Sequence, residues 1–491
     1  MTAIYSARWI LPIISSPIEN GAVAVDDSKI VAVGPKLEIV SRFLHAQVSD
    51  FGQAAILPGL VNAHSHLELT IMRGFLEARE HDFFAWLRKL TVTRMAMTPE
   101  DLRVSATCGV IEAVRAGITC VGDSSSLAME SMKTLRAAGL RGVVYQESFG
   151  PDRRLAGENV AKLREQIGEL RGFETNLVRV GLSPHAPYTV SALQLEMISK
   201  LAIDAKLPVM MHAAESQAER SLMMEGRGAF AEGLRKRGIE WQVPGVSSIQ
   251  YLARHEVLET KPLLAHCIYT DDADLELIRR SSAGIAHCPK SNAKLGHGRA
   301  PFAQFLSKQI NVGLGSDSVA SNNTCDILEE ARFAILLARL DVGSSSHLSE
   351  GVISHRGTSP RVSKGSGSFD LSDEPGALSH DRASAPIGAE QALFAATLGG
   401  ARALGLNDQI GALADGMQAD IVVVGLDRAH QQPLRNPADS LIFSSSGRDV
   451  LLTMVAGKEI YRNGSVNNVD EGEVCTEMKT IRAKLDSLPL T

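Results

Sequence analysis

The middle of the chain alternates short apolar segments with longer amphipathic ones, and this rhythm leaves few folds open. Four segments have helical periodicity, and we predict helices over residues 98–116, 129–139, 160–172 and 192–205. Each is followed by a short apolar run; in the same order these runs are ITCVGD, RGVVYQE, VRVGLSPH and LPVMMHAAE. LLAHC, AGIAHCP and INVGLGSD continue the series. Eight such strands, counting the one that ends at His64, predict an α/β fold of the (β/α)8 TIM-barrel type. An open doubly wound sheet gives a similar rhythm, but no Gly-rich phosphate loop follows the first strand.

Both ends of the chain carry β-strand signals. Residues 22–34, AVAVDDSKIVAVG, predict two strands around an Asp-Asp-Ser turn, and residues 411–425 and 449–464 repeat strand, turn and strand far downstream. We therefore predict one small β-sandwich domain formed by both chain ends, with the barrel inserted between its parts. The expected boundaries are 1–57 and 405–465 for the β-sandwich, 58–404 for the barrel and 466–491 for a C-terminal helix.

One segment interrupts the barrel pattern. Residues 341–386 are rich in Ser, Gly and charge and poor in large apolar side chains, which predicts a disordered or loosely packed insertion. A lid over the active site is the alternative for such a segment. We expect the histidines of this insertion, His347, His355 and His380, to be solvated.

The segment LPGLVNAHSHLEL ends an apolar run in His64 and His66. In a strand, residues i and i+2 point to the same face, so both imidazoles converge on one spot. Paired neutral imidazoles are ligands of zinc and related metals. With 14 histidines in the chain an HxH pair also arises by chance, so the pair gains weight only from what the other strands supply.

Polar side chains also end the later strands of the predicted barrel. In a barrel of this type the active site lies at the carboxyl ends of the strands, so groups far apart in sequence meet there. A single histidine at a strand end is more often a satisfied core residue. A whole set in register with the HxH pair predicts an active site instead: His185, His212, His266, His287 and Asp317.

The chemistry of these groups suggests a division of roles. Three imidazoles and one carboxylate suit one divalent metal ion, Zn²⁺ or Fe²⁺, which lowers the pKa of bound water: His64, His66, His212 and Asp317. Glu215 follows His212 by three residues and suits a proton shuttle, although a carboxylate in the first turn of a helix is also favoured by the helix dipole. His266 is the candidate to orient the nucleophile or stabilise an oxyanion, and His185 to contact substrate. We expect His287, with Asn292 behind it, to form a pocket wall or support other site residues.

Bulk properties narrow the possible partners. A net charge of -6 with 22% charged and 44% hydrophobic residues predicts a soluble protein that binds a small-molecule substrate, not nucleic acid or a membrane. The six cysteines lack CxxC spacing, and the N-terminal segment makes a poor signal peptide, so we expect a cytoplasmic protein. No lysine ends a middle strand, which favours a single metal ion over a bridged pair.

The motifs resemble the amidohydrolase superfamily, in particular its mononuclear, metal-dependent branch of nucleoside deaminases. The resemblance covers nearly the whole chain, with these segments in the expected order: PGLVNAHSH, SPHAPY, MHAAES, LLAHC, HCPKSNAKLGHGRAP, LGSDSVASNN, ATLGGARALGL and GALADGMQADIVVV. It implies a hydrolase of non-peptide C–N bonds, with the same metal ligands, Glu215 and His266 as catalytic residues and Asp317 as a further proton acceptor. It also implies attack of hydroxide on an amino-bearing ring carbon, loss of ammonia, and a homodimer.

Within that branch, HSHLEL, FFAWLRKL and WQVPGVSSIQYL are most similar to aminodeoxyfutalosine deaminases of menaquinone biosynthesis. S-adenosylhomocysteine and methylthioadenosine deaminases usually have HTHxxM, and here Glu68 replaces an apolar residue. Glu68 is expected either to bind a substrate hydroxyl or amino group or to pair with Arg73. The alternatives are another nucleoside or nucleobase deaminase, a same-fold hydrolase of chloride or cyclic amides, or an inactive scaffold protein, although every expected catalytic position is filled.

Overall fold

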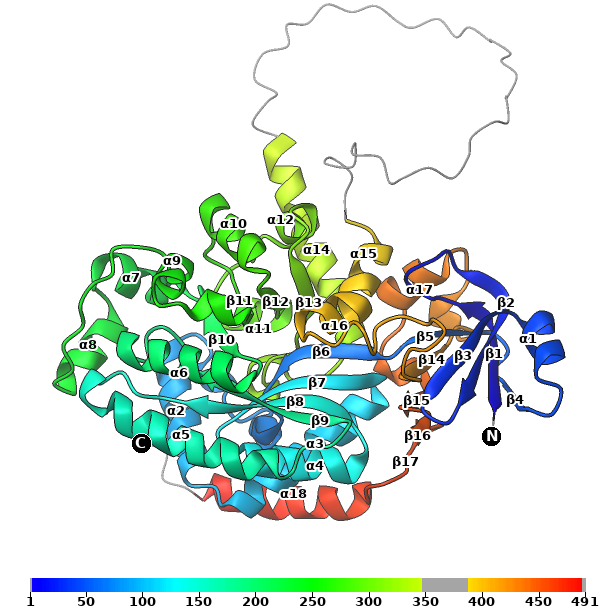
Figure 1. Ribbon diagram of the computed structural model, residues 1–491, viewed down its shortest axis with the longest axis horizontal. Coiled ribbons are helices and arrows are strands. Elements are labelled where there is room, and N and C mark those ends of the chain that lie inside the picture. Colours follow the sequence, from blue (N-terminus) through cyan, green and yellow to red (C-terminus); the bar gives the residue numbers. More distant parts are fainter. Residues whose placement is uncertain (1, 347–386, 488–491) are drawn as a thin grey trace, which may run out of the picture.

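The computed structural model describes residues 2–346 and 387–487. Its centre is built from two four-stranded parallel sheets, one in the order β6-β7-β8-β9 and one in the order β10-β11-β12-β13 (Figure 1). The first sheet comprises β6 (Leu60–Ser65), β7 (Ile118–Ser125), β8 (Arg141–Ser148) and β9 (Val178–Pro184). The second comprises β10 (Met210–Ala213), β11 (Leu263–His266), β12 (Gly284–His287) and β13 (Asn311–Leu314). These are the predicted strand segments.

The two sheets close into one barrel. A parallel bridge pairs Leu182 with Val209 where β9 meets β10, and another pairs Ser65 with Asp317 where the chain beyond β13 meets β6. Two backbone bonds support these seams: Leu182 N–H donates to the Pro208 carbonyl and Asp317 N–H to the His64 carbonyl, both at 2.9 Å. The predicted (β/α)8 barrel is therefore confirmed, and the open doubly wound sheet is excluded.

Helices surround the barrel, and several of them begin at a residue whose side chain caps the first turn. Helix α3 begins at a capping box in which Thr98 and Asp101 satisfy each other's backbone N–H groups. Its buried side chains divide between the main apolar core, which includes Val110 and Val114, and a second apolar cluster, which includes Leu102. The helices between barrel strands are α2 (Phe83–Met95), α3 (Pro99–Arg115), α4 (Ala128–Ala138), α5 (Ala156–Arg171), α6 (Ala192–Ala205), α7 (Gln217–Glu225), α8 (Ala229–Lys236), α9 (Ser248–Arg254), α10 (Asp272–Ser281), α11 (Pro289–Lys294) and α12 (Phe302–Ser307).

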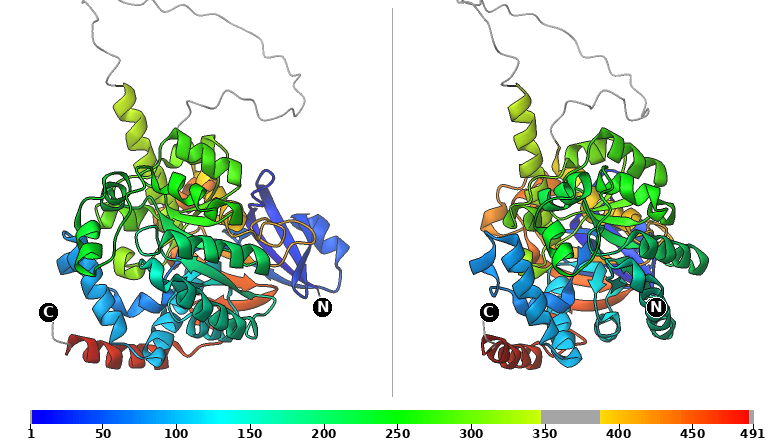
Figure 2. Two further views of the ribbon diagram at one scale, coloured as in Figure 1. Left: turned by 60° about the vertical axis from the view of Figure 1, so that its left-hand side comes forward. Right: turned by 90° about the vertical axis from the view of Figure 1, so that its left-hand side faces the viewer.

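Further helices follow the last barrel strand: α13 (Val319–Asn322), α14 (Ile327–Ser346), α15 (Ala389–Phe394), α16 (Gly400–Ala403), α17 (Pro437–Phe443) and α18 (Glu471–Asp486). Helix α14 runs into the first residues of the predicted insertion at 341–386. Residues 347–386, with their three histidines, lie outside the described part of the chain. Helix α18 is the predicted C-terminal helix and packs against α3 along one side of the barrel (Figures 1 and 2).

Strands from both chain ends form one sheet beside the barrel (Figures 1 and 2). It is built from β1 (Ala3–Ile10), β2 (Ile18–Asp26), β3 (Lys29–Pro35), β4 (Gln47–Asp50), β5 (Ala54–Pro58), β14 (Ile421–Gly425), β15 (Val450–Val455), β16 (Lys458–Arg462) and β17 (Ser465–Val466), with α1 (Lys36–Arg42) packed on it. Tyr5 Oη of β1 donates to Glu459 of β16 at 3.2 Å although three strands separate β1 from β16 in the sheet order. The sheet thus folds over its own apolar core, as expected for the small β domain.

A buried ion pair joins this sheet to the barrel. The guanidinium of Arg141, at the start of β8, donates to both carboxylate oxygens of Asp420 at 2.8 and 2.9 Å. Both side chains are almost fully buried, and Asp420 also accepts from the Ala456 N–H.

Among the described residues, no helix has the length and apolar character needed to cross a membrane.

Candidate active site

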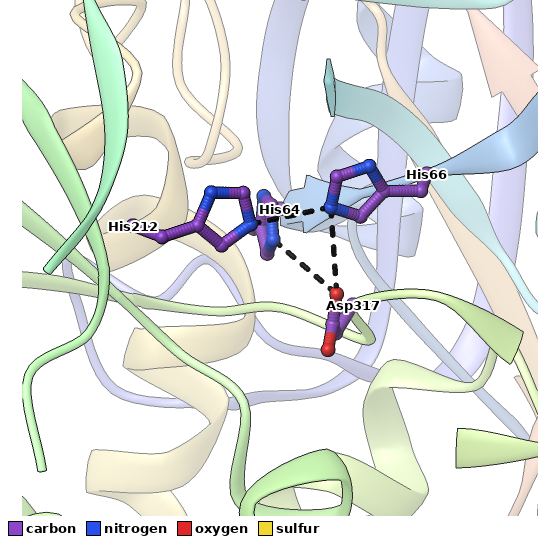
Figure 3. A group of neighbouring side chains, drawn as sticks. All are labelled: His64, His66, His212 and Asp317. Carbon is purple, nitrogen blue, oxygen red and sulfur yellow. Dashed lines mark hydrogen bonds and ion pairs between the residues drawn. The ribbon is translucent and has the colours of Figure 1, made fainter. Parts of the chain in front are cut away.

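Four side chains meet at the carboxyl ends of the barrel strands (Figure 3). His64 comes from β6 and His66 directly follows that strand, His212 comes from β10, and Asp317 from the loop after β13. One potential ligand atom from each lies within 4.8 Å of the other three. His64 Nε2 is 3.4 Å and His66 Nε2 3.6 Å from Asp317 Oδ1, and the Nε2 atoms of His66 and His212 are 3.3 Å apart. The structure therefore brings together the four residues predicted as metal ligands.

The end of β6 is clamped so that its two imidazoles face inward. Asp123, at the end of β7, accepts hydrogen bonds from the Leu67 N–H at 2.8 Å and from Ser65 Oγ at 3.1 Å. On the other side, β6 lies so close to the segment after β13 that a Cβ on Gly315 would stand 3.0 Å from the His64 carbonyl oxygen. The glycine allows this approach, which brings the carboxylate after β13 next to the His64 imidazole.

Asp317 has a left-handed backbone, with φ of 55°, which is uncommon for a residue other than glycine. Its N–H donates to the His64 carbonyl at 2.9 Å, and this contact holds the bend in place. Its Oδ2 accepts from Ser291 Oγ at 2.5 Å and Ser321 Oγ at 2.9 Å. The other oxygen, Oδ1, is thereby left to face the histidines. Strained backbone held by its surroundings is typical of functional positions.

The protonation states of these groups fit a metal ion. Burial lowers the pKa of His64 to about 4, and burial also holds the pKa of His212 well below its usual range. Burial opposes ionisation of Asp317, but the neighbouring imidazoles, His64 first, outweigh it and hold the pKa of the carboxyl well below its usual range. Neutral imidazoles and an ionised carboxylate are the forms that bind metal.

The unpaired ring nitrogens of His64 and the spacing of the donor atoms also fit a bound metal ion. Both ring nitrogens of His64 are buried without a hydrogen-bond partner among the described residues, which is costly unless something else contacts them. A zinc ion with ligands at about 2.1 Å holds neighbouring donor atoms roughly 3 to 3.5 Å apart. The separations of 3.3 to 3.6 Å between the donor atoms are close to that range. The four residues form a candidate site for one divalent metal ion.

His212 and His185 are linked through one carbonyl. The His212 Nδ1 donates to the His185 carbonyl at 3.0 Å, which directs Nε2 of His212 toward the cluster. The His185 ring lies 4.8 Å from the His212 ring and 4.6 Å from Phe149, measured between centroids. Thr189 Oγ1 lies 3.0 Å from His185 Nδ1. Burial lowers the pKa of His185 to about 3, so this imidazole is neutral.

Glu215 and His266 lie next to each other beside the cluster. His266 Nε2 is 3.7 Å from Glu215 Oε1, and His266 Nδ1 donates to Asn292 Oδ1 at 2.8 Å. Burial works against protonation of His266, but the charges of Glu215 and Asp317 and the hydrogen bond to Asn292 together outweigh it and raise the pKa. Glu219 fixes the loop before α7 because its carboxylate accepts the N–H groups of Ala214 and Glu215 at 2.8 and 2.9 Å.

These groups face a cavity of about 370 Å³ at the barrel mouth. Its wall includes both polar and apolar side chains: His66, Glu68, Phe83, Trp86, Leu87, Leu90, Arg94, Glu147, Phe149, His185, Tyr188, His212, Glu215, His266 and Asp317. His287 and Asn292 are not among the lining residues. The His287 ring stacks on Phe302 at 5.0 Å between centroids, and Asn292 contacts His266 from behind.

Glu68 lies in the cavity wall and is buried. Its carboxylate accepts hydrogen bonds from the Ser125 and Ser126 hydroxyls and from the backbone N–H groups of Ser126 and Leu127. The predicted alternative of an ion pair with Arg73 is wrong, because Arg73 pairs with Glu112 on α3. The 3₁₀ turn of residues 67–72 turns Glu68 toward the end of β7 instead.

Sequence reasoning missed two charged residues of the cavity. Arg94 Nη1 lies 3.5 Å from Glu147 Oε2 and 3.6 Å from Glu68 Oε1, and its guanidinium stands 5.9 Å from the centre of the Phe149 ring. Glu147 ends the predicted strand segment RGVVYQE and therefore carried the same strand-end signal as the histidines. Arg94 has no such signal. It lies on α2, which follows a long irregular connection, and the sequence pattern does not predict the direction in which that helix runs.

The chain belongs to the Amidohydrolase family, whose model matches residues 55–352 and 368–460. It is a hydrolase that acts on carbon–nitrogen bonds other than peptide bonds.

Several named proteins are similar over most of their length. The 5-methylthioadenosine/S-adenosylhomocysteine deaminase of Nitratidesulfovibrio vulgaris is 29% identical over 472 residues, covering 95% of this chain and 93% of that protein. The corresponding protein of Moorella thermoacetica is 28% identical, covering 96% of each. An adenosine deaminase from Xanthomonas campestris, solved with bound zinc, is 26% identical with a TM-score of 0.81 over 99% of both chains. The atrazine chlorohydrolase of Arthrobacter aurescens, at 20% identity, a TM-score of 0.78 and coverage of 98% of this chain and 100% of that one, shares the fold.

Proposed function

We propose that this protein is a metal-dependent hydrolytic deaminase of a 6-aminopurine nucleoside. One observation carries the proposal: a carboxylate and an imidazole, Glu215 and His266, stand beside a three-histidine and one-aspartate cluster in a single cavity. That combination supplies a metal ligand set, a proton-transfer group and an electrophilic donor together. The deaminase names of the relatives support the reaction class.

Zinc is the metal that we propose, held by His64, His66, His212 and Asp317. Nitrogen-rich sites with one carboxylate suit zinc, and the adenosine deaminase with a similar fold was solved with zinc. When bound, such an ion acts as a Lewis acid and lowers the pKa of water toward neutrality.

The chain's own residues divide the proton transfers. Glu215 accepts one proton of the attacking water and delivers it to the purine, and Asp317 accepts the other. The water oxygen forms a bond to the amino-bearing carbon, and the proton that Glu215 delivers stays on the purine ring. The carbon–nitrogen bond breaks, and the amino group leaves as ammonia with the one proton that Asp317 had accepted. His266, held by Asn292, stabilises the negative charge that develops during attack.

The far wall of the cavity favours a substrate larger than a free nucleobase. Aromatic and aliphatic side chains offer surfaces on which a purine and its substituent can pack: Phe83, Trp86, Leu87, Leu90, Phe149 and Tyr188. We propose that His185 donates a hydrogen bond to the purine or contacts its face. We propose that Glu68 supports this wall through the β7 end and Arg94, because its carboxylate is already occupied by hydroxyl and N–H donors.

Arg94 suggests the kind of substituent. Only one of its nitrogens makes the contacts described above, so the rest of the planar guanidinium remains available in a largely apolar wall. We propose that it pairs with a carboxylate on the 5′ side of the nucleoside. Aminodeoxyfutalosine and S-adenosylhomocysteine both carry such a carboxylate, whereas methylthioadenosine does not. The motif HSHLEL favours aminodeoxyfutalosine, and the relatives' names favour S-adenosylhomocysteine.

One experiment tests the function and the substrate together. The purified, zinc-loaded enzyme is assayed for ammonia release and for the ultraviolet change of purine deamination with adenosine, methylthioadenosine, S-adenosylhomocysteine and aminodeoxyfutalosine. We expect turnover of at least one nucleoside, with the highest kcat/KM for a carboxylate-bearing one. Absence of ammonia from all four contradicts the proposal, and chloride release from a chlorotriazine in the same assay assigns the other hydrolase class. Elemental analysis of the purified enzyme distinguishes zinc from iron.

A further inference from the structure

A second imidazole, that of His297, faces Glu215 beside His266. His297 Nε2 is 3.7 Å from Glu215 Oε1, the same oxygen that His266 Nε2 approaches at 3.7 Å from the other ring. Both Nε2 atoms are buried and have no hydrogen-bond partner among the described residues. Two unsatisfied imidazole nitrogens therefore converge on one carboxylate oxygen.

The local chain is shaped to place His297 there. The flanking residues, Gly296 and Gly298, have φ of 67° and 108°, values that glycine adopts without strain. The His297 N–H donates to the Asn292 carbonyl at 2.9 Å, and its ring packs edge-on against Phe83 at 4.5 Å between centroids. The ring is only 6% exposed. Such a bend buries a polar ring in a fixed position beside the carboxylate.

His297 and His266 share one anchor. The side chain of Asn292 accepts from His266 Nδ1, while its backbone carbonyl accepts from the His297 N–H. Any shift of this residue would move both imidazoles relative to Glu215. The two rings therefore form a single support around the carboxylate. Of the three, only Glu215 and His266 line the cavity, so His297 does not touch a substrate there.

We propose that His297 is a positioning residue for Glu215: its Nε2–H holds Oε1 and leaves Oε2 directed to the reacting atoms. Two observations agree with this role. Both imidazole Nε2 atoms approach Oε1 at 3.7 Å, and Oε2 makes no hydrogen bond with the described residues. Burial lowers the pKa of His297, which favours a neutral ring that carries a single N–H. A carboxylate that must take up and release a proton in each turnover benefits from a fixed orientation.

This inference rests on the proposed function, in which Glu215 transfers protons. The test replaces His297 by Phe, which keeps the ring packed against Phe83 but removes the N–H, and separately by Gln, which restores a donor. We expect H297F to lower kcat about 10- to 100-fold with KM within about twofold, and H297Q to recover part of that loss. Zinc content and the melting temperature of H297F should match those of the wild type.

A matched control is available on the outside of the barrel. His255 also pairs with a carboxylate, Glu196 at 2.8 Å, and packs edge-on against an aromatic ring, Tyr251 at 4.5 Å. H255F should leave kcat unchanged. Equal kcat for wild type and H297F, or a loss in H297F that H297Q does not recover, would overturn the positioning role.

A readout without substrate keeps this inference separate from the proposed function. Histidine-selective ¹⁵N NMR of the zinc-loaded enzyme should show the His297 ring as the neutral form protonated at Nε2, with a signal that shifts when Glu215 is replaced by Gln. A wild-type enzyme that deaminates no nucleoside contradicts the proposed function. A His297 signal that is protonated at Nδ1, or that is unchanged in E215Q, contradicts the contact itself.

Discussion

The two ends of the active cavity are built differently. At one end the candidate metal ligands stand on or just beyond three barrel strands, and backbone bonds hold them, such as that from the Asp317 N–H to the His64 carbonyl at 2.9 Å. At the other end Arg94 comes from α2, and its contacts with Glu68 and Glu147 are 3.6 and 3.5 Å long. The first end is fixed by the sheet, whereas the second depends on side chains that a substrate can rearrange.

This difference teaches where reaction and selectivity lie in the molecule. The strand ends hold charges and proton-transfer groups through backbone bonds, and the chemistry requires such groups to be closely positioned. The wall from α2 and the end of β8 offers one cation, the carboxylate of Glu147 and several apolar surfaces, which suit the part of a substrate that varies between related enzymes. Variants at the first end should therefore abolish turnover of every substrate, and variants at the second should change the preference among substrates.

The largest effect is expected from the metal ligands. Replacing His64 or Asp317 by Ala removes one of four converging donors, so bound zinc should be lost and turnover should fall to background for all nucleosides. Elemental analysis and the ammonia assay measure the two losses together. H255A, far from the cavity, serves as the control. Retained stoichiometric zinc in both variants would mean that the cluster is not the metal site.

Next in size is the loss of the proton-transfer group. E215Q keeps the shape of the side chain but cannot accept a proton, so kcat should fall by about two to four orders of magnitude with zinc retained. E225Q, an exposed change at the end of the helix that follows Glu215, should behave as wild type. A near-normal kcat for E215Q would assign proton transfer to another group, and it would also remove the basis of the role proposed for His297.

A third variant tests a contact that should affect the stability of the fold but neither end of the cavity. D420A leaves Arg141 buried without its partner at the junction of the β domain and the barrel, which should cost about 3–5 kcal/mol in free energy of unfolding. Urea unfolding of the zinc-loaded enzyme measures this loss, and kcat at 25 °C should stay unchanged. D50A breaks the exposed pair of Asp50 with Lys36 and should cost about 1 kcal/mol or less. A change in kcat for D420A would mean that the junction reaches the active site.

The fourth variant addresses substrate preference. R94M keeps a long apolar side chain but removes the cation, so a carboxylate-bearing nucleoside should lose roughly 1.5–3 kcal/mol of binding energy. Its kcat/KM should therefore fall about 10- to 150-fold. The value for methylthioadenosine should change by less than about threefold. Steady-state kinetics with both substrates gives the ratio. Equal losses for the two would show that Arg94 supports the wall without selecting the substrate.

The sequence predicts the first end of the cavity well and the second end poorly, for physical reasons. His212 and His266 follow apolar runs whose place in a parallel barrel is set by the strand and helix rhythm, so their meeting point follows from topology. Arg94 lies after a connection of 3₁₀ turns, and no periodicity predicts which way α2 points. His297 was hidden for a similar reason: only the bend between two glycines turns it toward Glu215. Glu147 carried the strand-end signal and was overlooked.

The smallest expected effect is a change in stability from a buried glutamate next to the end of the cavity that holds the metal ligands. Glu330 on α14 accepts from Asn322 Nδ2 at 2.6 Å, and the same amide group donates to the Ser316 carbonyl at 2.7 Å, next to Asp317. Burial raises the pKa of Glu330 to about 7, so the folded protein holds a proton there that the unfolded chain releases near its usual value of 4.5. The resulting stabilisation is complete below about pH 4.5 and is lost as the pH rises through 7.

The free energy of unfolding of the wild type, measured relative to E330Q, should therefore fall by about 1–3 kcal/mol between pH 5 and pH 8. Urea unfolding of the zinc-loaded proteins at several pH values gives this slope, and a constant offset from altered hydrogen bonding does not affect it. The neighbouring Glu329 is the matched control: burial opposes its ionisation, but its contacts with Lys290 outweigh that and lower its pKa, so E329Q and the wild type should run parallel over the same range. If the free energies of unfolding of E330Q and the wild type also change in parallel with pH, Glu330 is ionised in the folded protein. The metal-ligand end of the cavity then has a buried charge behind it.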